Sequence, residues 1–244
     1  MRNVIVTGAS RGLGLAIARR LAAAGYAAIA VARKEGAELA AAIAAAGRSR
    51  PDAIQFVSFD LGDIEGLPRF VADLRKRFGP IHGLVNNAAL GSDGALSLMH
   101  NSKIEQLVRL NTLSPIVLTK YVVRAMMADG GGRIVNVASI VATTGYSGLS
   151  VYAATKASMV GFTRSLAREV GRMGVNVNAV APGFLDTEMT RDLADEGRAK
   201  VARRSALQRL ATVDEVADAV EFLLGDKAAS ITGTVLTVDA GSTA

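Results

Sequence analysis

The sequence predicts a single-domain α/β protein with a doubly wound parallel sheet of about seven strands and helices on both faces. Short β-branched runs alternate with helical stretches along the chain. A glycine-rich segment separates the first strand from the first helix, as in nucleotide-binding α/β folds. No proline-rich, serine-rich or repeated segment divides the 244 residues, so we expect one domain over residues 1–244.

The expected strands are short apolar runs, which is typical of strands buried on both faces of a parallel sheet. They cover residues 4–6, 28–31, 54–59, 81–85, 134–137, 175–180 and 235–238. The segments between them are amphipathic or alanine-rich and favour helices. These helices are expected at residues 13–24, 35–46, 67–78, 103–127, 150–170 and 213–224.

Composition limits the classes of function. The chain has no cysteine and only two histidines, His82 and His100, so we predict neither disulfides nor a metal site. No signal-like leader precedes the first strand, and no apolar run reaches the ~20 residues that span a bilayer. We therefore expect a soluble, cytoplasmic protein. The formal charge of +6 would suit acidic partners, but no nucleic-acid reading motif is present, so neither nucleic acid nor membrane is predicted as a partner.

The glycine-rich segment, residues 7–14, reads Thr-Gly-Ala-Ser-Arg-Gly-Leu-Gly. Its three glycines leave room for the backbone to approach a pyrophosphate at the helix N-terminus. The alternative is a tight turn without a ligand, but the position between a strand and a helix favours a dinucleotide site. The predicted contacts are Gly8, Ser10, Arg11, Gly12, Leu13 and Gly14.

The second expected strand runs into Val-Ala-Arg-Lys at residues 31–34. A carboxylate at this place usually binds the adenosine ribose of NAD, whereas a base suits the additional phosphate of NADP. Arg33 presents a planar guanidinium fork, and Arg11 could approach from the glycine-rich loop. The sequence therefore predicts NADPH/NADP+ as the cofactor, with NAD less favoured. The alternative is that both arginines are solvated surface charges.

The next two strand ends also carry polar residues. Asp60, followed by Leu61, either accepts a hydrogen bond from an adenine amine or caps the next helix. Residues 86–89 read Asn-Asn-Ala-Ala, in which small residues permit cofactor packing and amides can hold the loop. Asp60, Leu61, Asn87 and Ala88 are therefore predicted cofactor contacts. A purely structural turn is the alternative for residues 86–89.

Tyr152 and Lys156 are four residues apart at the start of an expected helix, and so share one helical face. A nearby ammonium favours the phenolate, so we expect it to lower the pKa of the tyrosine. Ser139 follows the fifth strand, at the sheet edge where ligands of open α/β folds bind. Its hydroxyl could bind a substrate carbonyl oxygen while Tyr152 donates a proton as hydride reaches the carbon. The nucleotide-binding loop and the activated tyrosine together indicate redox chemistry. Each residue also has an alternative interpretation when taken alone. The tyrosine could be a core residue whose hydroxyl is simply hydrogen-bonded, and the lysine could be a solvated surface cation.

These motifs, in this order, resemble the short-chain dehydrogenase/reductase family, and the similarity spans residues 4–241. The resemblance implies a Rossmann-type NAD(P)-binding domain and an oxidoreductase that interconverts a ketone and a secondary alcohol. The features that carry it are the glycine-rich loop, Ser139, Tyr152-x-x-x-Lys156 and Pro182-Gly183.

The resemblance also implies roles for further residues. Asn111 would complete a catalytic tetrad with Ser139, Tyr152 and Lys156, by holding a water that passes protons to the lysine. The residues implied to meet the nicotinamide carboxamide are Pro182, Gly183, Leu185 and Thr187.

Within the family, the chain is most similar to 3-oxoacyl-acyl-carrier-protein reductases, through Ser-Arg-Gly at 10–12 and Val-Asp-Ala-Gly at 238–241. This similarity implies reduction of a 3-oxoacyl thioester, carried by an acidic acyl carrier protein or by CoA, in fatty acid biosynthesis. Arg172 matches a position at which those reductases dock the carrier. Asp129 stands where they have a base, which weakens the match to an acidic partner.

Two other functions stay open. The same residues could oxidise a small alcohol, diol or sugar, or the chain could be a nucleotide-binding sensor without catalysis. The substrate wall is expected in residues 142–149, where Tyr146 and Leu149 could line it, and in residues 185–204. The second segment is either a mobile lid or a solvated surface helix.

Family members are commonly tetramers, so we expect a homotetramer. The helix at 150–170 carries Ala153, Ala157 and Gly161 at four-residue spacing, which would let a second helix approach closely. The alternative is that these small residues pack inside one subunit.

Overall fold

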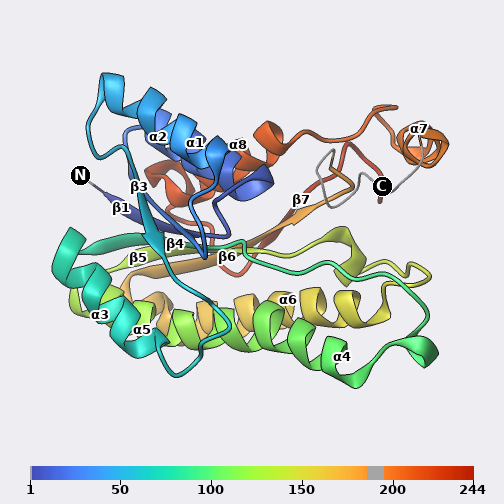
Figure 1. The fold of residues 1–244 in the computed structure, drawn as a ribbon, viewed down its shortest axis with the longest axis horizontal. Coiled ribbons are helices and arrows are strands. Elements are labelled where there is room, and N and C mark those ends of the chain that lie inside the picture. Colours follow the sequence, from blue (N-terminus) through green and yellow to red (C-terminus); the bar gives the residue numbers. More distant parts are fainter. Residues whose placement is uncertain (1, 186–194) are drawn as a thin grey trace.

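A seven-stranded parallel sheet forms the middle layer of the molecule, in the order β3-β2-β1-β4-β5-β6-β7 (Figure 1). The structure, a computed structural model, describes residues 2–185 and 195–244. The strand order runs outward in both directions from β1 and β4, which confirms the predicted doubly wound sheet. The strands are β1 (Asn3–Thr7), β2 (Ala27–Ala32), β3 (Ile54–Ser58), β4 (Ile81–Asn86), β5 (Gly132–Val137), β6 (Val175–Pro182) and β7 (Val235–Val238).

Helices cover both faces of the sheet (Figure 1). One face carries α1 (Gly12–Ala23), α2 (Ala37–Ser49) and α8 (Val213–Leu224). The other face carries α3 (Leu67–Phe78), α4 (Asn101–Val108), α5 (Ser114–Ala128) and α6 (Ser150–Val170). A further helix, α7 (Asp195–Arg204), lies beyond the sheet near the C-terminus. Short 3-10 turns are η1 (Leu96–Leu98), η3 (Ile140–Ala142), η4 (Gly171–Met173) and η6 (Asp226–Ala228).

The sheet separates two apolar cores. Val4 and Val6 of β1 face the core under α1 and α8, while Ile5 between them faces the core under α3, α5 and α6. Successive side chains of a strand point to opposite faces, so both sets are buried. This arrangement explains why the strand sequences are mostly apolar.

The prediction of a single helix at residues 103–127 is wrong. Two helices, α4 and α5, are separated there by a π-helical turn, η2 (Arg109–Leu113), with the buried Asn111 at its centre. A π turn inserts one residue into the helical repeat and so changes the direction of the side chain at that point. The Asn111 amide is thereby aimed at the segment after β4, where it bonds the backbone of Leu90.

Candidate active site

The glycine-rich loop joins β1 to α1 with very little free space inside the turn. Gly8 has a positive φ of 68° and its N–H donates to the carbonyl oxygen of Val31 at 2.8 Å. A Cβ at Gly14 would lie 2.3 Å from the Gly8 carbonyl oxygen, so no larger residue fits there without moving the backbone. No side chain caps the N-terminus of α1. Its first N–H groups are therefore available to an anion, and this geometry fits a dinucleotide pyrophosphate.

Asn87 and Thr7 hold this loop from behind. The Asn87 side-chain amide donates to the carbonyl oxygens of Thr7 at 2.9 Å and Gly8 at 3.3 Å. The Thr7 hydroxyl accepts from the backbone N–H groups of Asn87 at 2.9 Å and Ala88 at 3.0 Å. The predicted use of an asparagine amide to hold a loop is confirmed. Thr7 was missed as a site residue, although a threonine directly before the first glycine was a signal that could have indicated it.

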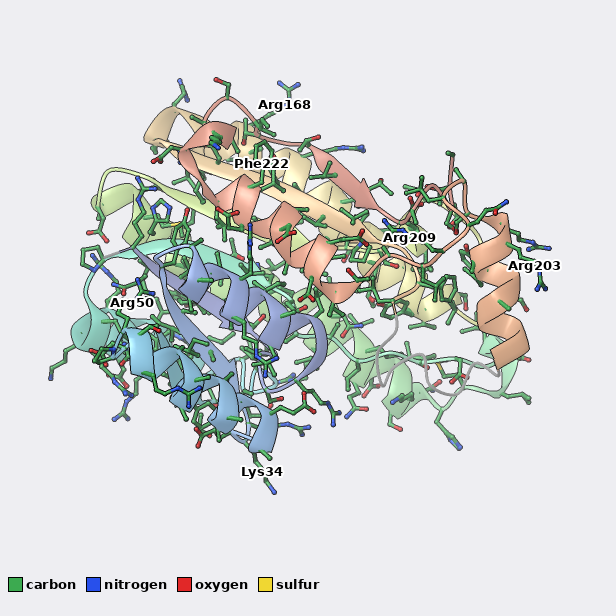
Figure 2. All side chains as sticks on the ribbon, turned by 90° about the horizontal axis from the view of Figure 1, so that it is seen from above. Lys34, Arg50, Arg168, Arg203, Arg209 and Phe222 are labelled. Carbon is green, nitrogen blue, oxygen red and sulfur yellow. The ribbon has the colours of Figure 1, made fainter. Side chains whose placement is uncertain are left out.

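Arg33 lies in a loop beside the glycine-rich turn. The Arg33 carbonyl oxygen accepts from the Ser58 hydroxyl at 3.0 Å, which ties the loop to the end of β3. A Cβ at Gly36 would lie 3.8 Å from the Ser10 carbonyl oxygen, so the two loops are in contact distance. The side chains of Arg33 and Lys34 are exposed, and Figure 2 shows Lys34 pointing outward from this end of the molecule. Basic groups therefore stand next to the predicted pyrophosphate site.

Asp60 forms a turn of its own after β3. Its carboxylate accepts from the N–H of Gly62 at 2.9 Å, whereas α3 begins only at Leu67, with Gly66 as its N-cap. The alternative in which Asp60 caps the following helix is therefore wrong, because a tight turn comes between them. The Leu61 side chain is buried in the core under α3, so only its backbone can face a ligand.

Tyr152 and Lys156 lie on the first turns of α6, as predicted, and Ser139 follows β5 at the same edge of the sheet. The Lys156 ammonium is buried and donates to the Val137 carbonyl oxygen at 2.8 Å. This bond ties α6 to the strand end two residues before Ser139. The Ser139 side chain, at the start of η3, accepts from the N–H of Val141 at 3.4 Å. A serine, a tyrosine and a lysine thus gather at one strand end.

The pKa of Tyr152 does not follow the sequence-based expectation. Burial raises the pKa of the tyrosine to about 12, and burial also lowers the pKa of Lys156 to about 8. The ammonium lies over the tyrosine ring, 5.7 Å from the ring centroid. Desolvation therefore outweighs charge attraction, and the expected lowering is wrong. A tyrosine with a raised pKa is protonated at neutral pH, which is the form that donates a proton.

Asn111 reaches the same helix through Thr155. The Asn111 amide nitrogen donates to the Thr155 hydroxyl at 3.2 Å, and that hydroxyl donates to the carbonyl oxygen of Tyr152 at 2.8 Å. The other Asn111 contacts are to the backbone of Leu90. The structure therefore brings all four predicted catalytic residues to the region between β5, η2 and the start of α6. Thr155 was missed, although its place between the tyrosine and the lysine is plain in the sequence.

The residues implied to meet a nicotinamide lie at the end of β6. Pro182 is its last residue, and the N–H of Gly183 donates to the Val238 carbonyl oxygen at 3.0 Å. Leu185 forms a parallel bridge with Ala211, and its side chain is buried in the core under α1 and α8. Thr187 lies outside the described residues, as do residues 186–194 of the predicted lid.

Two aromatic rings stand at the expected substrate wall. Tyr146 meets Phe184 edge-on, with ring centroids 5.5 Å apart, and is 36% exposed. Leu149 is half-buried just before α6. Phe184 was missed because its only sequence signal was its position after Pro182-Gly183. The pair joins the segment before α6 to the segment after β6.

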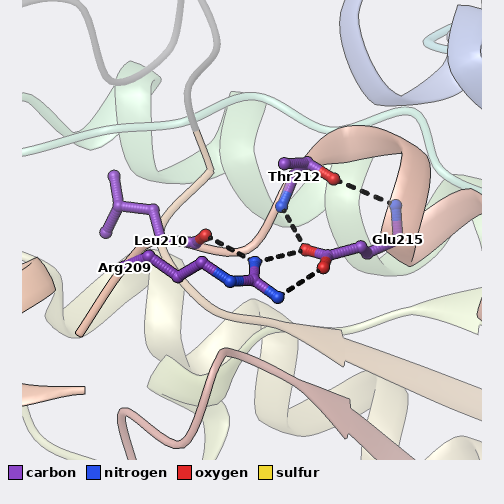
Figure 3. Close-up of polar contacts among 4 residues, drawn as sticks. All are labelled: Arg209, Leu210, Thr212 and Glu215. Carbon is purple, nitrogen blue, oxygen red and sulfur yellow. Dashed lines mark hydrogen bonds and ion pairs between the residues drawn. The ribbon is translucent and has the colours of Figure 1, made fainter. Parts of the chain in front are cut away.

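The segment after α7 is held by an ion pair and a helix cap (Figure 3). Arg209 donates to both carboxylate oxygens of Glu215, at 2.9 and 2.6 Å. Glu215 accepts in turn from the backbone N–H of Thr212, whose hydroxyl accepts from the N–H of Glu215. This capping box fixes the start of α8 next to Ala211, the partner of Leu185.

Within residues 2–185 and 195–244, no group of three or more histidine, cysteine, aspartate or glutamate side chains is placed to bind a metal ion. In the same part of the chain, no helix combines the length and apolar character needed to cross a bilayer.

The fold and this strand-end cluster define a nucleotide-binding α/β oxidoreductase, and comparison with known proteins places it in a family. Residues 2–198 match the short chain dehydrogenase family. The 3-oxoacyl-[acyl-carrier-protein] reductase FabG of Escherichia coli (strain K12) is 40% identical over 239 residues, which are 97% of this chain and 95% of FabG. The chain therefore belongs to the short-chain dehydrogenase/reductase family, and it is an oxidoreductase acting on the CH–OH/C=O pair.

Solved structures of similar fold carry nicotinamide cofactors. A gluconate 5-dehydrogenase from Burkholderia cenocepacia J2315, in complex with NADP and tartrate, has a TM-score of 0.92 and 31% identity, covering 99% of this chain and 95% of that one. A blue fluorescent protein from a metagenomic library, in complex with NADPH, has a TM-score of 0.92 and 30% identity, covering 100% and 98%. The resemblance thus extends along the whole chain.

Proposed function

We propose that the protein is an NADPH-dependent reductase that converts a ketone to a secondary alcohol, with 3-oxoacyl thioesters as the preferred substrates. The observation that carries this proposal is the Tyr152–Lys156 pair, in which the half-buried tyrosine lies beside a buried lysine that bonds Val137 at the end of β5. A protonated tyrosine beside Ser139 suits protonation of a reduced carbonyl.

In this mechanism, Ser139 binds and polarises the ketone oxygen, and Tyr152 donates its proton to the alkoxide that develops there. The chemistry expected from bound NADPH is hydride donation to the carbonyl carbon. Lys156 would hold the nicotinamide ribose and pass a proton back to Tyr152 after the transfer. Asn111 would hold a water through which Lys156 regains its proton.

The remaining predicted contacts would hold the cofactor. The loop from Gly8 to Gly14 would cradle the pyrophosphate, with Asn87 and Ala88 behind it. Arg33 would bind the 2′-phosphate of the cofactor. The choice of NADPH is supported by the similar structures that contain NADP or NADPH. Asp60 and the backbone of Leu61 would meet the adenine.

The preferred substrate class follows from the similarity to FabG, whose name states its reaction with an acyl-carrier-protein thioester. The charge of Asp129 favours CoA over an acidic carrier protein as the carrier of the acyl chain. Asp129 is engaged in an ion pair with Arg75, at 2.6 and 2.8 Å, so this part of the α5 end presents a neutralised pair rather than a free base to an acidic carrier. Arg172, by contrast, is exposed. CoA thioesters are therefore included in the proposal.

A second candidate is the oxidation of a small alcohol, diol or sugar, favoured by the fold similarity to a gluconate 5-dehydrogenase. Rates of NADPH oxidation with acyl thioesters of several lengths should be compared with rates of NADP+ reduction with gluconate, diols and simple alcohols. Higher kcat/KM for the thioesters supports the first candidate. Higher kcat/KM for gluconate would replace it by the second.

The test of the mechanism is Tyr152→Phe. Loss of the proton donor should lower kcat by about 10²–10⁴-fold, while the Kd of NADPH, measured by fluorescence titration, stays nearly unchanged. Retention of both cofactor binding and substantial turnover would disprove the assignment of Tyr152. A parent protein that binds NADPH but turns over no substrate of the panel would favour the non-catalytic sensor.

The test of cofactor choice is Arg33→Asp. A carboxylate at this place should repel the 2′-phosphate and accept from the ribose hydroxyls, so preference should move from NADPH toward NADH. The measurement is kcat/KM for each cofactor with one substrate. Unchanged kcat/KM for NADPH in the variant contradicts the assignment, and Arg48→Asp on α2 is the control for added negative charge.

A further inference from the structure

We propose that Thr155 is a positioning residue for the proton-transfer step. Its hydroxyl joins the turn of α6 that carries Tyr152 to Asn111 in the π turn. This inference rests on the proposed function, in which Tyr152 is the proton donor. Thr155 is buried and its hydroxyl bonds Asn111 and the backbone of Tyr152, so its effect on the reaction would pass through these two residues.

The donor and acceptor roles of the Thr155 hydroxyl are fixed by its two partners. Its Oγ1 lies 2.8 Å from the Tyr152 carbonyl oxygen and 3.2 Å from the Asn111 amide nitrogen. The carbonyl only accepts and the amide nitrogen only donates, so the threonine must donate its single proton to Tyr152 and accept from Asn111. Valine at this position would fill the same volume and could make neither bond.

At the other end of this connection, both protons of the Asn111 amide nitrogen are used. Its Oδ1 accepts from the N–H of Leu90 at 2.8 Å, and its Nδ2 donates to the Leu90 carbonyl oxygen at 2.9 Å. The second Nδ2 proton goes to Thr155. Removing the threonine hydroxyl would therefore leave a buried N–H without its partner, a costly state that favours rotation of the amide.

A parallel connection strengthens the same junction. The Thr112 hydroxyl lies 3.0 Å from the Ser158 hydroxyl, which donates to the Thr155 carbonyl oxygen at 2.6 Å. The π turn and α6 are thus linked at two neighbouring points. Only the bond through the Thr155 side chain ends on the backbone of Tyr152, so this bond is the one expected to orient the phenol.

The test is Thr155→Val. Because small displacements of a reacting group strongly reduce rate, kcat of NADPH-dependent ketone reduction should fall about tenfold. The Kd of NADPH should stay within about twofold, because the Thr155 hydroxyl bonds neither the glycine-rich loop nor Arg33, which would hold the phosphates of the cofactor. Thr155→Ser keeps the hydroxyl and should restore kcat to within about threefold of the parent.

The matched control is Thr163→Val on the same helix. Thr163 is also fully buried, donates to the Met159 carbonyl oxygen at 2.7 Å and accepts from the Asn136 amide at 2.8 Å. Thr163→Val should lower the Tm by about as much as Thr155→Val does. Its kcat should stay within about twofold of the parent, because Thr163 lies two turns beyond Lys156.

Equal kcat in the two valine variants, or a serine variant as slow as Thr155→Val, would overturn the inference. These two outcomes differ from the one that would disprove the proposed function itself. That outcome is normal turnover in Tyr152→Phe.

Discussion

At the residue scale, burial decides the charge states of the two groups that matter most. The same desolvation raises the pKa of Tyr152 to about 12 and lowers that of Lys156 to about 8. Both shifts favour the neutral form of the group. Tyr152 therefore keeps its proton throughout the physiological range, while Lys156 becomes the group that titrates near neutrality.

The pH dependence of turnover should reflect this lysine. The kcat/KM for NADPH reports groups of the free enzyme, so it should be constant below about pH 7 and fall as pH rises through about 8, where Lys156 loses its charge. Initial rates of ketone reduction between pH 6 and 10 provide the measurement. In Lys156→Arg the charge persists, so the fall near pH 8 should vanish. An unchanged fall in that variant would assign it to another group.

Spacing predicted the tyrosine–lysine pair, but not its pKa values. The four-residue interval places both side chains on one helical face, which needs no tertiary information. Desolvation depends on the tertiary packing around the pair, such as the contact of Lys156 with Val137 of β5, and the interval does not contain this packing. The sign of the tyrosine shift was therefore beyond a prediction made from the interval alone.

At the element scale, the N-terminus of helix α8 is stabilised by the Arg209–Glu215 ion pair and the capping box. Hydrogen bonding from Arg209, and then from the Thr212 backbone, lowers the pKa of Glu215 to about 2, below its usual value of about 4.5. A lowered folded-state pKa means that the carboxylate contributes stability above about pH 5 and loses it as pH falls toward 2. The groups are largely exposed, so the contribution is screened by solvent.

Arg209→Gln should lower the Tm slightly at pH 7, and its difference from the parent should shrink as pH falls from 5 to about 2, because protonation removes the ion pair in both proteins. Thermal unfolding followed by circular dichroism measures this difference. Arg69→Gln, which breaks a long and exposed Arg69–Asp73 pair on α3, is the control and should leave the Tm unchanged. A constant Tm difference for Arg209→Gln across pH would contradict the assigned cause.

Regular elements followed from the sequence far better than irregular ones. Leu67–Phe78, Ser150–Val170 and Val213–Leu224 have their predicted bounds because apolar periodicity and flanking signals agree there. The break at Arg109–Leu113 lies just before Pro115, which has no N–H to donate to the carbonyl oxygen of Asn111 four residues earlier. The proline indicates a boundary, but the π turn also depends on long-range bonds between Asn111 and Leu90, which a local pattern does not contain.

At the scale of the whole molecule, the outer surface of α6 bears on assembly. Ala157 and Gly161 are exposed, so the alternative that they pack inside one subunit is wrong. Beside them, Val108 and Ala154 belong to a shallow, mainly apolar groove between α4 and α6. We propose that a second subunit covers this face in a homotetramer. Closely approaching helices need small residues at their contact.

Gly161→Leu should separate the subunits without unfolding them. A Cβ at this position meets no atom within 4 Å of the isolated subunit, so the cost should appear only at the contact between subunits. Light scattering at micromolar concentration should give a tetramer for the parent and a smaller mass for the variant. Gly47→Leu, an equally open position on α2, should retain the parent mass. A monomeric parent would refute the assembly.

The bonds from Asn87 and Thr7 to the glycine-rich loop have a thermodynamic consequence. They join protein groups to one another, so the loop is ordered before a ligand arrives and binding should lose little conformational entropy there. Amide hydrogen exchange should accordingly be slow at Asn87 and Ala88 even without ligand, because both N–H groups are already bonded to Thr7. Affinity at this end of the molecule would then depend on how well the loop is ordered in advance.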